Sequence, residues 1–185
     1  MAPNWFIGLP VEMSGPVSHS PAPPCVRMFV AEDLHMTVAF LGSVEERQAG
    51  SAWAEAARLA ASLGRPVKGD FVRVQALGNP RRPSALAALV GLGAEPLAEL
   101  MQALQGPALA AAELPPETRG PLPHVTLGRI ARRASRPERR EALRWAEALD
   151  LSALRFSVSR LALYTWAEDR RQRLFRIVQS LQLAA

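Results

Sequence analysis

The sequence is short of several residue types, and each shortage excludes a class of protein. Cys25 is the only cysteine, so the chain can form no internal disulfide and no cysteine-rich zinc site. No stretch reaches the roughly 18 uncharged apolar residues that a membrane span needs. The first ten residues also lack the basic and apolar segments of a secretory signal. We therefore expect a cytoplasmic protein with no membrane attachment.

Lysine is almost absent as well. Lys68 is the only lysine among 22 cationic side chains, so arginine carries nearly all of the positive charge behind the net charge of +5. This balance favours an anionic partner, and the planar guanidinium suits phosphate because it can donate two parallel hydrogen bonds. An arginine-rich composition also fits a coding bias that leaves most of these groups on solvated faces. Charge alone therefore does not identify the partner.

Histidine and threonine are scarce, yet they recur together. The chain has three histidines and four threonines, and the strings His35-Met36-Thr37-Val38 and His124-Val125-Thr126-Leu127 place the same pair at the same spacing once in each half. Composition alone rarely produces such a repeat. The third histidine, His19, lies between two serines in a proline-rich segment and has no threonine partner. The repeat is therefore the main indication of function.

Strand and helix patterns alternate along the chain. We predict strands over Trp5–Leu9, Val26–Val30, His35–Leu41, Phe71–Val74, Ala85–Val90, His124–Ile130, Leu154–Leu163 with a bulge, and Leu174–Leu181. We predict helices over Val44–Leu63, Glu95–Ala112 and from Ser135 to about Leu149, the first behind a capping box of Ser43 and Glu46. Pro10–Pro24 is predicted to be a loop with at most a short helix, and Gly78-Asn79-Pro80 a turn.

Several of these strands are joined by turns too short for a parallel crossover, which favours antiparallel sheets. With 185 residues and 49% hydrophobic side chains, the chain is long enough for one domain, residues 1–185. The fold class is therefore predicted to be α+β. We expect two similar lobes whose mostly antiparallel sheets face a central groove, with helices on the outside.

The spacing of the repeated pair has a chemical meaning in a strand. Residues i and i+2 share one face, so His35 points with Thr37 and His124 with Thr126, while the residues between them pack behind. Facing each other across a groove, two imidazoles and two hydroxyls would converge on a space about the size of one phosphate.

Phosphodiester hydrolysis needs a base on the attacking side and an acid on the leaving side, and histidine can fill both roles near neutral pH. The threonine hydroxyls would donate hydrogen bonds to the non-bridging oxygens, where charge concentrates. The scheme needs no metal, and two histidines without a carboxylate cluster make a poor metal site.

The motifs resemble those of the 2H phosphoesterases, and among these the RNA 2′,3′-cyclic phosphodiesterases that are also called 2′-5′ RNA ligases. The similarity is most specific in residues 33–42 and 123–129 and extends from Phe6 to Leu181. It implies hydrolysis of an RNA-terminal 2′,3′-cyclic phosphate to a 2′-phosphate without a cofactor, and a reversible 2′-5′ joining reaction without ATP. By motif position, His35 would be the proton donor and His124 the proton acceptor. The residues themselves do not orient these two roles.

The resemblance also makes Arg129 a phosphate ligand, although strict alternation turns it away from His124 and Thr126 unless the strand twists or ends there. Other side chains that could contact RNA, or serve only as surface charge and core, are Arg81, Arg82, Arg132, Arg133, Phe29, Tyr164 and Trp166. We expect the partner to be RNA with a terminal 2′,3′-cyclic phosphate, and the protein to be a monomer. Two alternatives stay open: a phosphodiesterase for small cyclic nucleotide phosphates, and an RNA-end binding protein without turnover.

Overall fold

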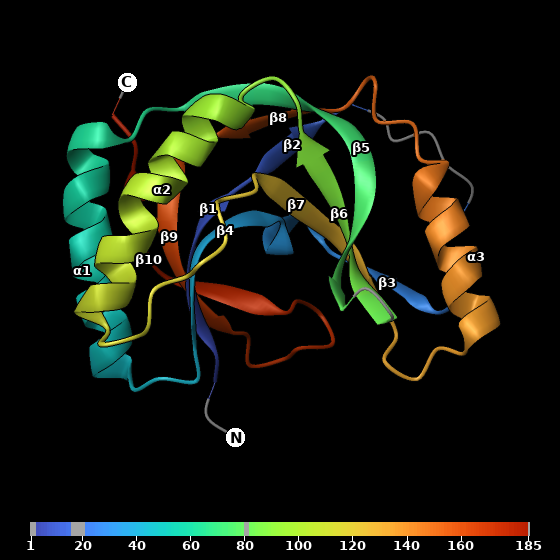
Figure 1. The fold of residues 1–185 in the computed structure, drawn as a ribbon, viewed down its shortest axis with the longest axis horizontal. Helices are drawn as coiled ribbons and strands as arrows, with labels where there is room; N and C mark the ends of the chain where they lie inside the picture. Colours follow the sequence, from blue (N-terminus) through green and yellow to red (C-terminus); the bar gives the residue numbers. More distant parts are fainter. Residues whose placement is uncertain (1–2, 16–20, 80–81, 185) are drawn as a thin grey trace.

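The computed structural model describes residues 3–15, 21–79 and 82–184, which form two antiparallel sheets with helices outside them (Figure 1). One sheet has the strand order β10-β9-β1-β4, with β1 (Trp5–Pro10), β4 (His35–Gly42), β9 (Arg160–Trp166) and β10 (Phe175–Gln182). The other has the order β2-β8-β5-β6-β7-β3, with β2 (Glu12–Ser14), β3 (Val26–Met28), β5 (Val67–Asn79), β6 (Arg82–Val90), β7 (His124–Ile130) and β8 (Arg155–Val158). The α+β class with antiparallel sheets is thereby confirmed.

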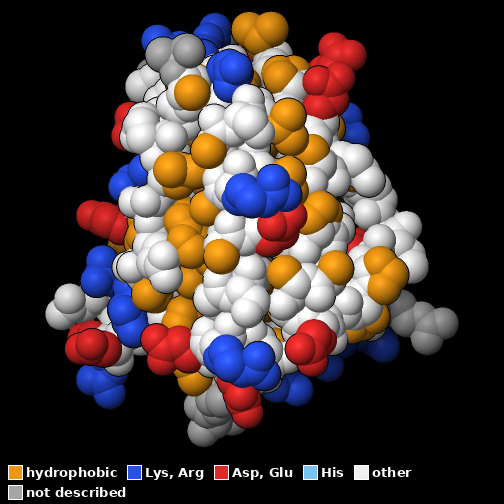
Figure 2. All heavy atoms as spheres, turned by 90° about the vertical axis from the view of Figure 1, so that its left-hand side faces the viewer, with side chains coloured by type: hydrophobic (Ala, Val, Ile, Leu, Met, Phe, Trp, Pro, Cys, Tyr) orange, Lys and Arg blue, Asp and Glu red, His pale blue; other side chains and the backbone are white. Residues whose placement is uncertain are grey.

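Three α-helices lie outside the sheets in the described part of the chain. The helices α1 (Glu46–Leu63) and α2 (Ala94–Ala111) pack side by side at one end, with α2 against β4, and α3 (Arg136–Glu147) packs on β5 at the other end (Figure 1). A short 3-10 helix, η1 (Ala31–Asp33), leads into β4. Figure 2 shows the outward face at the α1 end, where apolar, basic and acidic side chains are interspersed and no histidine is visible.

The sequence of α1 explains how closely this helix packs. Four alanines spaced three or four residues apart are fully buried, namely Ala49, Ala52, Ala56 and Ala60. This spacing forms one stripe along the helix, and the small side chains let it lie close to its neighbours. The helix ends at Gly64, where an added Cβ would come within 2.6 Å of the Leu183 side chain. The same Cβ would lie 2.7 Å from the Ala60 carbonyl oxygen, so a larger residue here would require the main chain to shift.

Two predicted helix starts have different outcomes. Before α3, the predicted start is confirmed, because Ser135 is the N-cap and forms a capping box with Glu138. Before α1, the prediction was wrong, because the capping box is formed by Glu45 and Gln48, two residues beyond Ser43. The side chain of Gln48 also donates to the carbonyl of Ala112, which ties the start of α1 to the end of α2. This long-range contact is not visible in the local sequence.

Two strand predictions also need correction. The shift in alternation after Val158 is not a bulge, because the chain leaves the six-stranded sheet at the end of β8 and enters the four-stranded sheet as β9. The segment predicted as a loop over Pro10–Pro24 contains β2, which pairs with β8. Residues 16–20 of that segment, and Pro80 of the predicted turn, lie outside the described residues.

The two sheets repeat one arrangement of four strands. The order β10-β9-β1-β4 in one sheet corresponds to β8-β5-β6-β7 in the other, so the two motif strands β4 and β7 hold equivalent places. Gly8 pairs with Thr37, and Ala87 pairs with Thr126 at the equivalent position. A single cluster of buried apolar side chains includes residues from both sheets and all three α-helices. The two lobes are therefore similar in topology and share one core.

Candidate active site

The two motif strands have the same irregularity at the same place. In β4 the register shifts between Thr37 and Ala39, which leaves Val38 as the extra residue of a β-bulge. In β7 it shifts between Thr126 and Gly128, which leaves Leu127 as the extra residue. Both bulges lie three residues after the histidine. Each motif therefore adopts the same backbone shape, and a bulge re-aims the side chains that follow it.

Both bulges are held by hydrogen bonds from other elements. The carbonyl of Val38 accepts from the side-chain amide of Gln105 on α2 at 3.0 Å. The carbonyl of Leu127 accepts from the main-chain N–H of Phe29 at 2.8 Å. An extra strand residue leaves main-chain groups outside the regular ladder, and these contacts satisfy one such group in each lobe.

The two motif histidines are oriented in the same way. Nδ1 of His35 lies 2.6 Å from the carbonyl oxygen of Asp33, and Nδ1 of His124 lies 2.7 Å from the carbonyl oxygen of Leu122. A carbonyl can only accept, so Nδ1 carries the proton and donates it in both rings. Nε2 is then left with its lone pair in the neutral ring. Each histidine therefore presents Nε2 for proton transfer.

The surroundings of His35 are largely aromatic. Its ring centroid lies 4.6 Å from that of Phe6, 5.2 Å from that of Tyr164 and 5.3 Å from that of Phe175. Burial lowers the pKa of His35 to about 4, against the opposing effect of the hydrogen bond to the Asp33 carbonyl, and the positive charges of His124 and Arg129 lower it further. His124 and Arg129 of the second lobe are therefore near enough to His35 to interact with it electrostatically.

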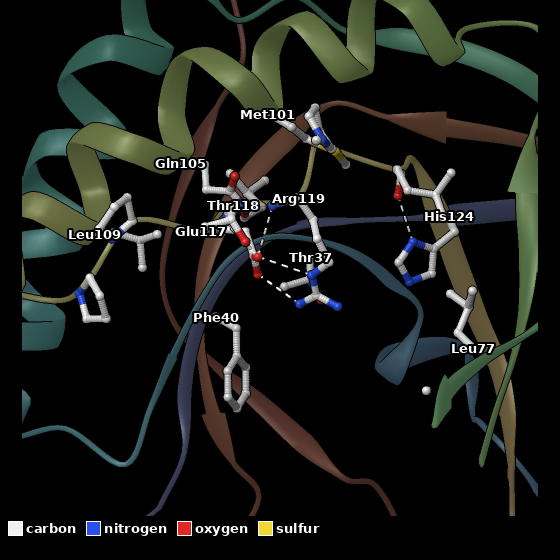
Figure 3. A pocket seen from close by; sticks show the side chains of 17 residues that line it. Thr37, Phe40, Leu77, Met101, Gln105, Leu109, Glu117, Thr118, Arg119 and His124 are labelled. Atoms are coloured by element: carbon white, nitrogen blue, oxygen red, sulfur yellow. Dashed lines mark hydrogen bonds and ion pairs between the residues drawn. The ribbon is translucent and has the colours of Figure 1, made fainter. Parts of the chain in front are cut away.

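Two adjoining cavities meet at the motifs. The larger, about 800 Å³, is lined by His124, by Thr37 and Phe40, and by the loop before β7, as Figure 3 shows. The smaller, about 400 Å³, is lined by His35 and Arg129 and again by Thr37 and Phe40. The two cavities share Thr37 and Phe40, so together they form one groove with a histidine on each side. Thr126 is half-buried on the face of β7 that carries His124.

Arg129 points into this groove, although regular strand alternation would turn its side chain away from His124 and Thr126. Beyond the bulge at Leu127, the side chain that regular alternation would turn away returns to the face of His124 and Thr126. Burial, and the charge of Arg170, lower the pKa of Arg129. The equivalent residue in the first lobe is Phe40, five residues after His35, which is 59% exposed. Both positions face the groove.

Other residues that the sequence singled out lie in different settings. Trp166 and Phe29 line the smaller cavity. Tyr164 is only 1% exposed and cannot stack on a ligand; burial raises its pKa, and its hydroxyl has no partner among the described residues. Arg82 donates to the carbonyl of Arg132, while Arg81 lies outside the described residues. Sequence reasoning thus placed these aromatic and basic side chains less well than the motifs.

Asp33 is a site residue whose role the sequence did not reveal. Its carboxylate is 2% exposed and accepts hydrogen bonds from the main-chain N–H groups of Leu174 and Phe175, at 2.8 to 3.0 Å. Its carbonyl holds His35 at the same time. Asp33 therefore fixes the start of β10 relative to the first histidine. The sequence signal that could have pointed to this role was an acidic residue in the mostly apolar segment before His35.

Neither a metal site nor a membrane helix is found in the described part of the chain. No three side chains of histidine, cysteine, aspartate or glutamate are grouped so that they could hold a metal ion. None of the described helices has the length and apolar character needed to cross a bilayer. The two motif histidines and the arginine-lined cavity are thus the chemically distinctive groups of the groove.

Two antiparallel lobes that place equivalent His-x-Thr strands on one groove define a phosphoesterase of the two-histidine class. A model of the 2′-5′ RNA ligase superfamily matches residues 24–170, more than half of the chain. The chain belongs to this superfamily. No curated protein sequence matches it.

Solved structures with the same fold cover nearly the whole chain. E. coli LigT complexed with 3′-AMP aligns with a TM-score of 0.68 at 17% identity over 100% of both chains. The protein TT0787 of Thermus thermophilus aligns with a TM-score of 0.68 at 18% identity over 97% of both chains. Usb1 of Kluyveromyces marxianus aligns with a TM-score of 0.52 at 15% identity over 97% of this chain and 98% of its own. At these identities the comparison establishes the fold.

Proposed function

We propose that this protein hydrolyses RNA 2′,3′-cyclic phosphate ends to 2′-phosphates without a metal ion, with His35 as proton donor and His124 as proton acceptor. The observation that carries the proposal is the equivalent presentation of two histidines, one from each lobe, on a single groove. In both, Nδ1 is held by a carbonyl two residues earlier, so Nε2 is left for chemistry. Family membership and the nucleotide complexes of LigT support the same class of substrate.

The reaction follows from a phosphate placed between the two rings. Nε2 of His124 accepts a proton from water while the water oxygen bonds to phosphorus. The bond from phosphorus to O3′ breaks, and His35, which takes up a proton at Nε2 when the anionic phosphate binds, passes this proton to O3′, which leaves a 2′-phosphate. Thr37 and Thr126 donate to the non-bridging oxygens, and Arg129 stabilises their charge. In this scheme the chain's own side chains supply both proton transfers.

The size of the groove favours a polynucleotide over a small cyclic phosphate. In this scheme the attacking water enters on the His124 side, yet the cavity there is about 800 Å³ and far exceeds the space of a water molecule. A second RNA strand could occupy this space. Its 5′-hydroxyl would replace water as the nucleophile, which gives the 2′-5′ joining reaction by the same proton transfers.

The test is hydrolysis of an oligoribonucleotide ending in a 2′,3′-cyclic phosphate, with EDTA present and the position of the product phosphate mapped. His35→Ala and His124→Ala should each lower kcat by at least about a hundredfold, since general acid or base catalysis contributes roughly that much or more. His19→Ala is the matched control, because His19 belongs to neither motif. Circular dichroism of each variant reports whether the fold is retained.

Three results would contradict the proposal. They are an unchanged substrate, activity that appears only with a divalent ion, and full activity in either motif variant. Tight binding of the RNA end without hydrolysis at any pH would instead identify an RNA-end binding protein. A faster rate on a nucleoside cyclic phosphate than on RNA would identify a small-molecule phosphodiesterase. The same substrates therefore separate all the alternatives.

A further inference from the structure

An unusual pair of arginines lies beside the reactive part of the groove. Arg27 on β3 and Arg129 on β7 are direct cross-strand partners, and both line the smaller cavity. Like charges placed directly opposite each other in an antiparallel pair are destabilising. Such a pair is expected where a bound anion offsets the repulsion.

A third arginine joins them from the loop between β9 and β10. The guanidinium of Arg170 lies over the ring of Trp166, 4.5 Å from its centroid, and both side chains line the same cavity. The guanidinium of Arg27 donates to the carbonyls of Arg170 and Arg171, at 2.6 and 3.3 Å. Arg27 therefore holds the loop that carries Arg170.

Among the described residues, no acidic side chain forms an ion pair with this cluster. The twelve residues that line the smaller cavity include Arg27, Arg129 and Arg170 but no aspartate or glutamate. In the described part of the chain, ion pairs join Arg58 to Glu55 and Arg119 to Glu117, so none of the three cavity arginines forms one. Three guanidinium groups around an unneutralised cavity of about 400 Å³ indicate a binding site for an anion.

We propose that Arg170, stacked on Trp166, forms with Arg27 and Arg129 a site for a second phosphate of the RNA, the 5′-phosphate of the terminal nucleotide. The assignment rests on the proposed function. With His35 as proton donor to O3′, the terminal ribose lies on the His35 side of the reactive phosphorus. The smaller cavity is on that side, so it receives the 5′ side of the same nucleotide.

Binding of product-like nucleotides tests this site without turnover. Adenosine 2′,5′-bisphosphate and adenosine 2′-monophosphate are titrated into the wild type, Arg170→Ala and Arg173→Ala. The wild type should bind the bisphosphate at least about tenfold more tightly, since hydrogen bonds between charged groups are the strong ones. Arg170→Ala should reduce this preference to less than about twofold and leave the affinity for the monophosphate unchanged.

Arg173→Ala is the matched control, because it removes the same charge from the same loop without touching the cavity lining. It should keep the preference for the bisphosphate. A dinucleotide ending in a 2′-phosphate carries the second phosphate as a diester, and its tight binding would assign the site to the RNA backbone. If the dinucleotide instead binds no more tightly than adenosine 2′-monophosphate, that assignment is overturned and the site is restricted to small molecules with a terminal phosphate.

Equal binding of the two adenosine nucleotides by the wild type would overturn the proposal, and so would an undiminished preference in Arg170→Ala. These failures differ from failure of the proposed function. An intact preference in a protein that does not hydrolyse RNA cyclic phosphates leaves the second-phosphate site standing. Hydrolysis without a preference removes the site and leaves the proposed reaction standing.

Discussion

His35 is expected to stay neutral in the empty protein until the pH falls to about 4. Burial among aromatic rings disfavours the imidazolium, and His124 and Arg129 add unfavourable positive charge. The hydrogen bond from Nδ1 to the Asp33 carbonyl opposes this shift without reversing it. The pKa of His35 is therefore well below the ordinary value of 6.5.

The lowered pKa has a defined effect on stability. The unfolded chain takes up the His35 proton near pH 6.5 and the folded protein only near pH 4, so the unfolded state binds more protons between these values. The stabilisation is then fully present above pH 6.5 and is lost as the pH falls toward 4. A shift of this size corresponds to about 3 kcal/mol of unfolding free energy.

A bound phosphate should reverse much of the shift. One negative charge about 5 Å from the ring, at an effective dielectric constant of about 20, favours the imidazolium by about 3 kcal/mol. This raises the pKa of His35 by about two. His35 would then gain its proton together with the substrate. Because His35 must carry its proton to act as donor, its pKa sets the alkaline limb of the pH profile. Since kcat reports the complex and kcat/KM the free enzyme, the alkaline limb of kcat should lie at higher pH than that of kcat/KM.

Proton NMR of the imidazole signals measures both effects, with the His35 signal assigned by its loss in His35→Gln. The midpoint should lie near pH 4 in the empty protein and rise by about two units with adenosine 2′-monophosphate bound. A midpoint near 6.5 in the empty protein would refute the burial argument. A midpoint that the nucleotide does not move would show that its phosphate lies far from His35.

Three substitutions test how the groove is built. Asp33→Asn should loosen the start of β10 and raise KM, because an amide offers one acceptor oxygen in place of a carboxylate; amide hydrogen exchange in β10 checks this. Gly128→Ala would put Cβ 2.8 Å from the Arg27 carbonyl, so β3 must shift; thermal unfolding should show about 1–3 kcal/mol of destabilisation. Phe40→Ala should raise KM with less than about 0.5 kcal/mol change in stability, since Phe40 is 59% exposed.

The central part of the fold could be predicted because local signals and tertiary structure agree there. The pattern around His35 predicts a half-buried strand, and β4 covers the predicted residues. The start of α3 at Ser135 is likewise set by a local signal and was predicted correctly. The capping box predicted for α1 from Ser43 and Glu46 was wrong, because Glu45 and Gln48 form the box, and Gln48 also donates to the distant Ala112 carbonyl. The bulge predicted after Val158 was wrong, because a change of sheet produces the same shift in alternation as a bulge.

In the site as well, the features that depend on nearby residues could be predicted, and those that depend on distant residues could not. Each histidine and threonine pair shares a face because strand alternation is regular as far as the threonine. Arg129 could not be placed, because a bulge depends on the neighbouring strands and not on the residues around Leu127. The contribution of Arg170 was equally hidden, since a loop more than 40 residues away along the chain brings it beside Arg129.

The two lobes are nearly symmetric at the motifs and differ in the residues that follow the bulges. Up to the bulges the two motifs are equivalent in residue type, register and histidine orientation, as suits two proton transfers on opposite sides of one phosphorus atom. Beyond the bulges, the first lobe presents Phe40 and the second presents Arg129 to the same groove. An exposed aromatic ring suits a base or ribose, and a guanidinium suits a phosphate. The equivalent halves supply the chemistry of the proposed reaction, and this divergent pair would give the groove a direction for the proposed RNA strand.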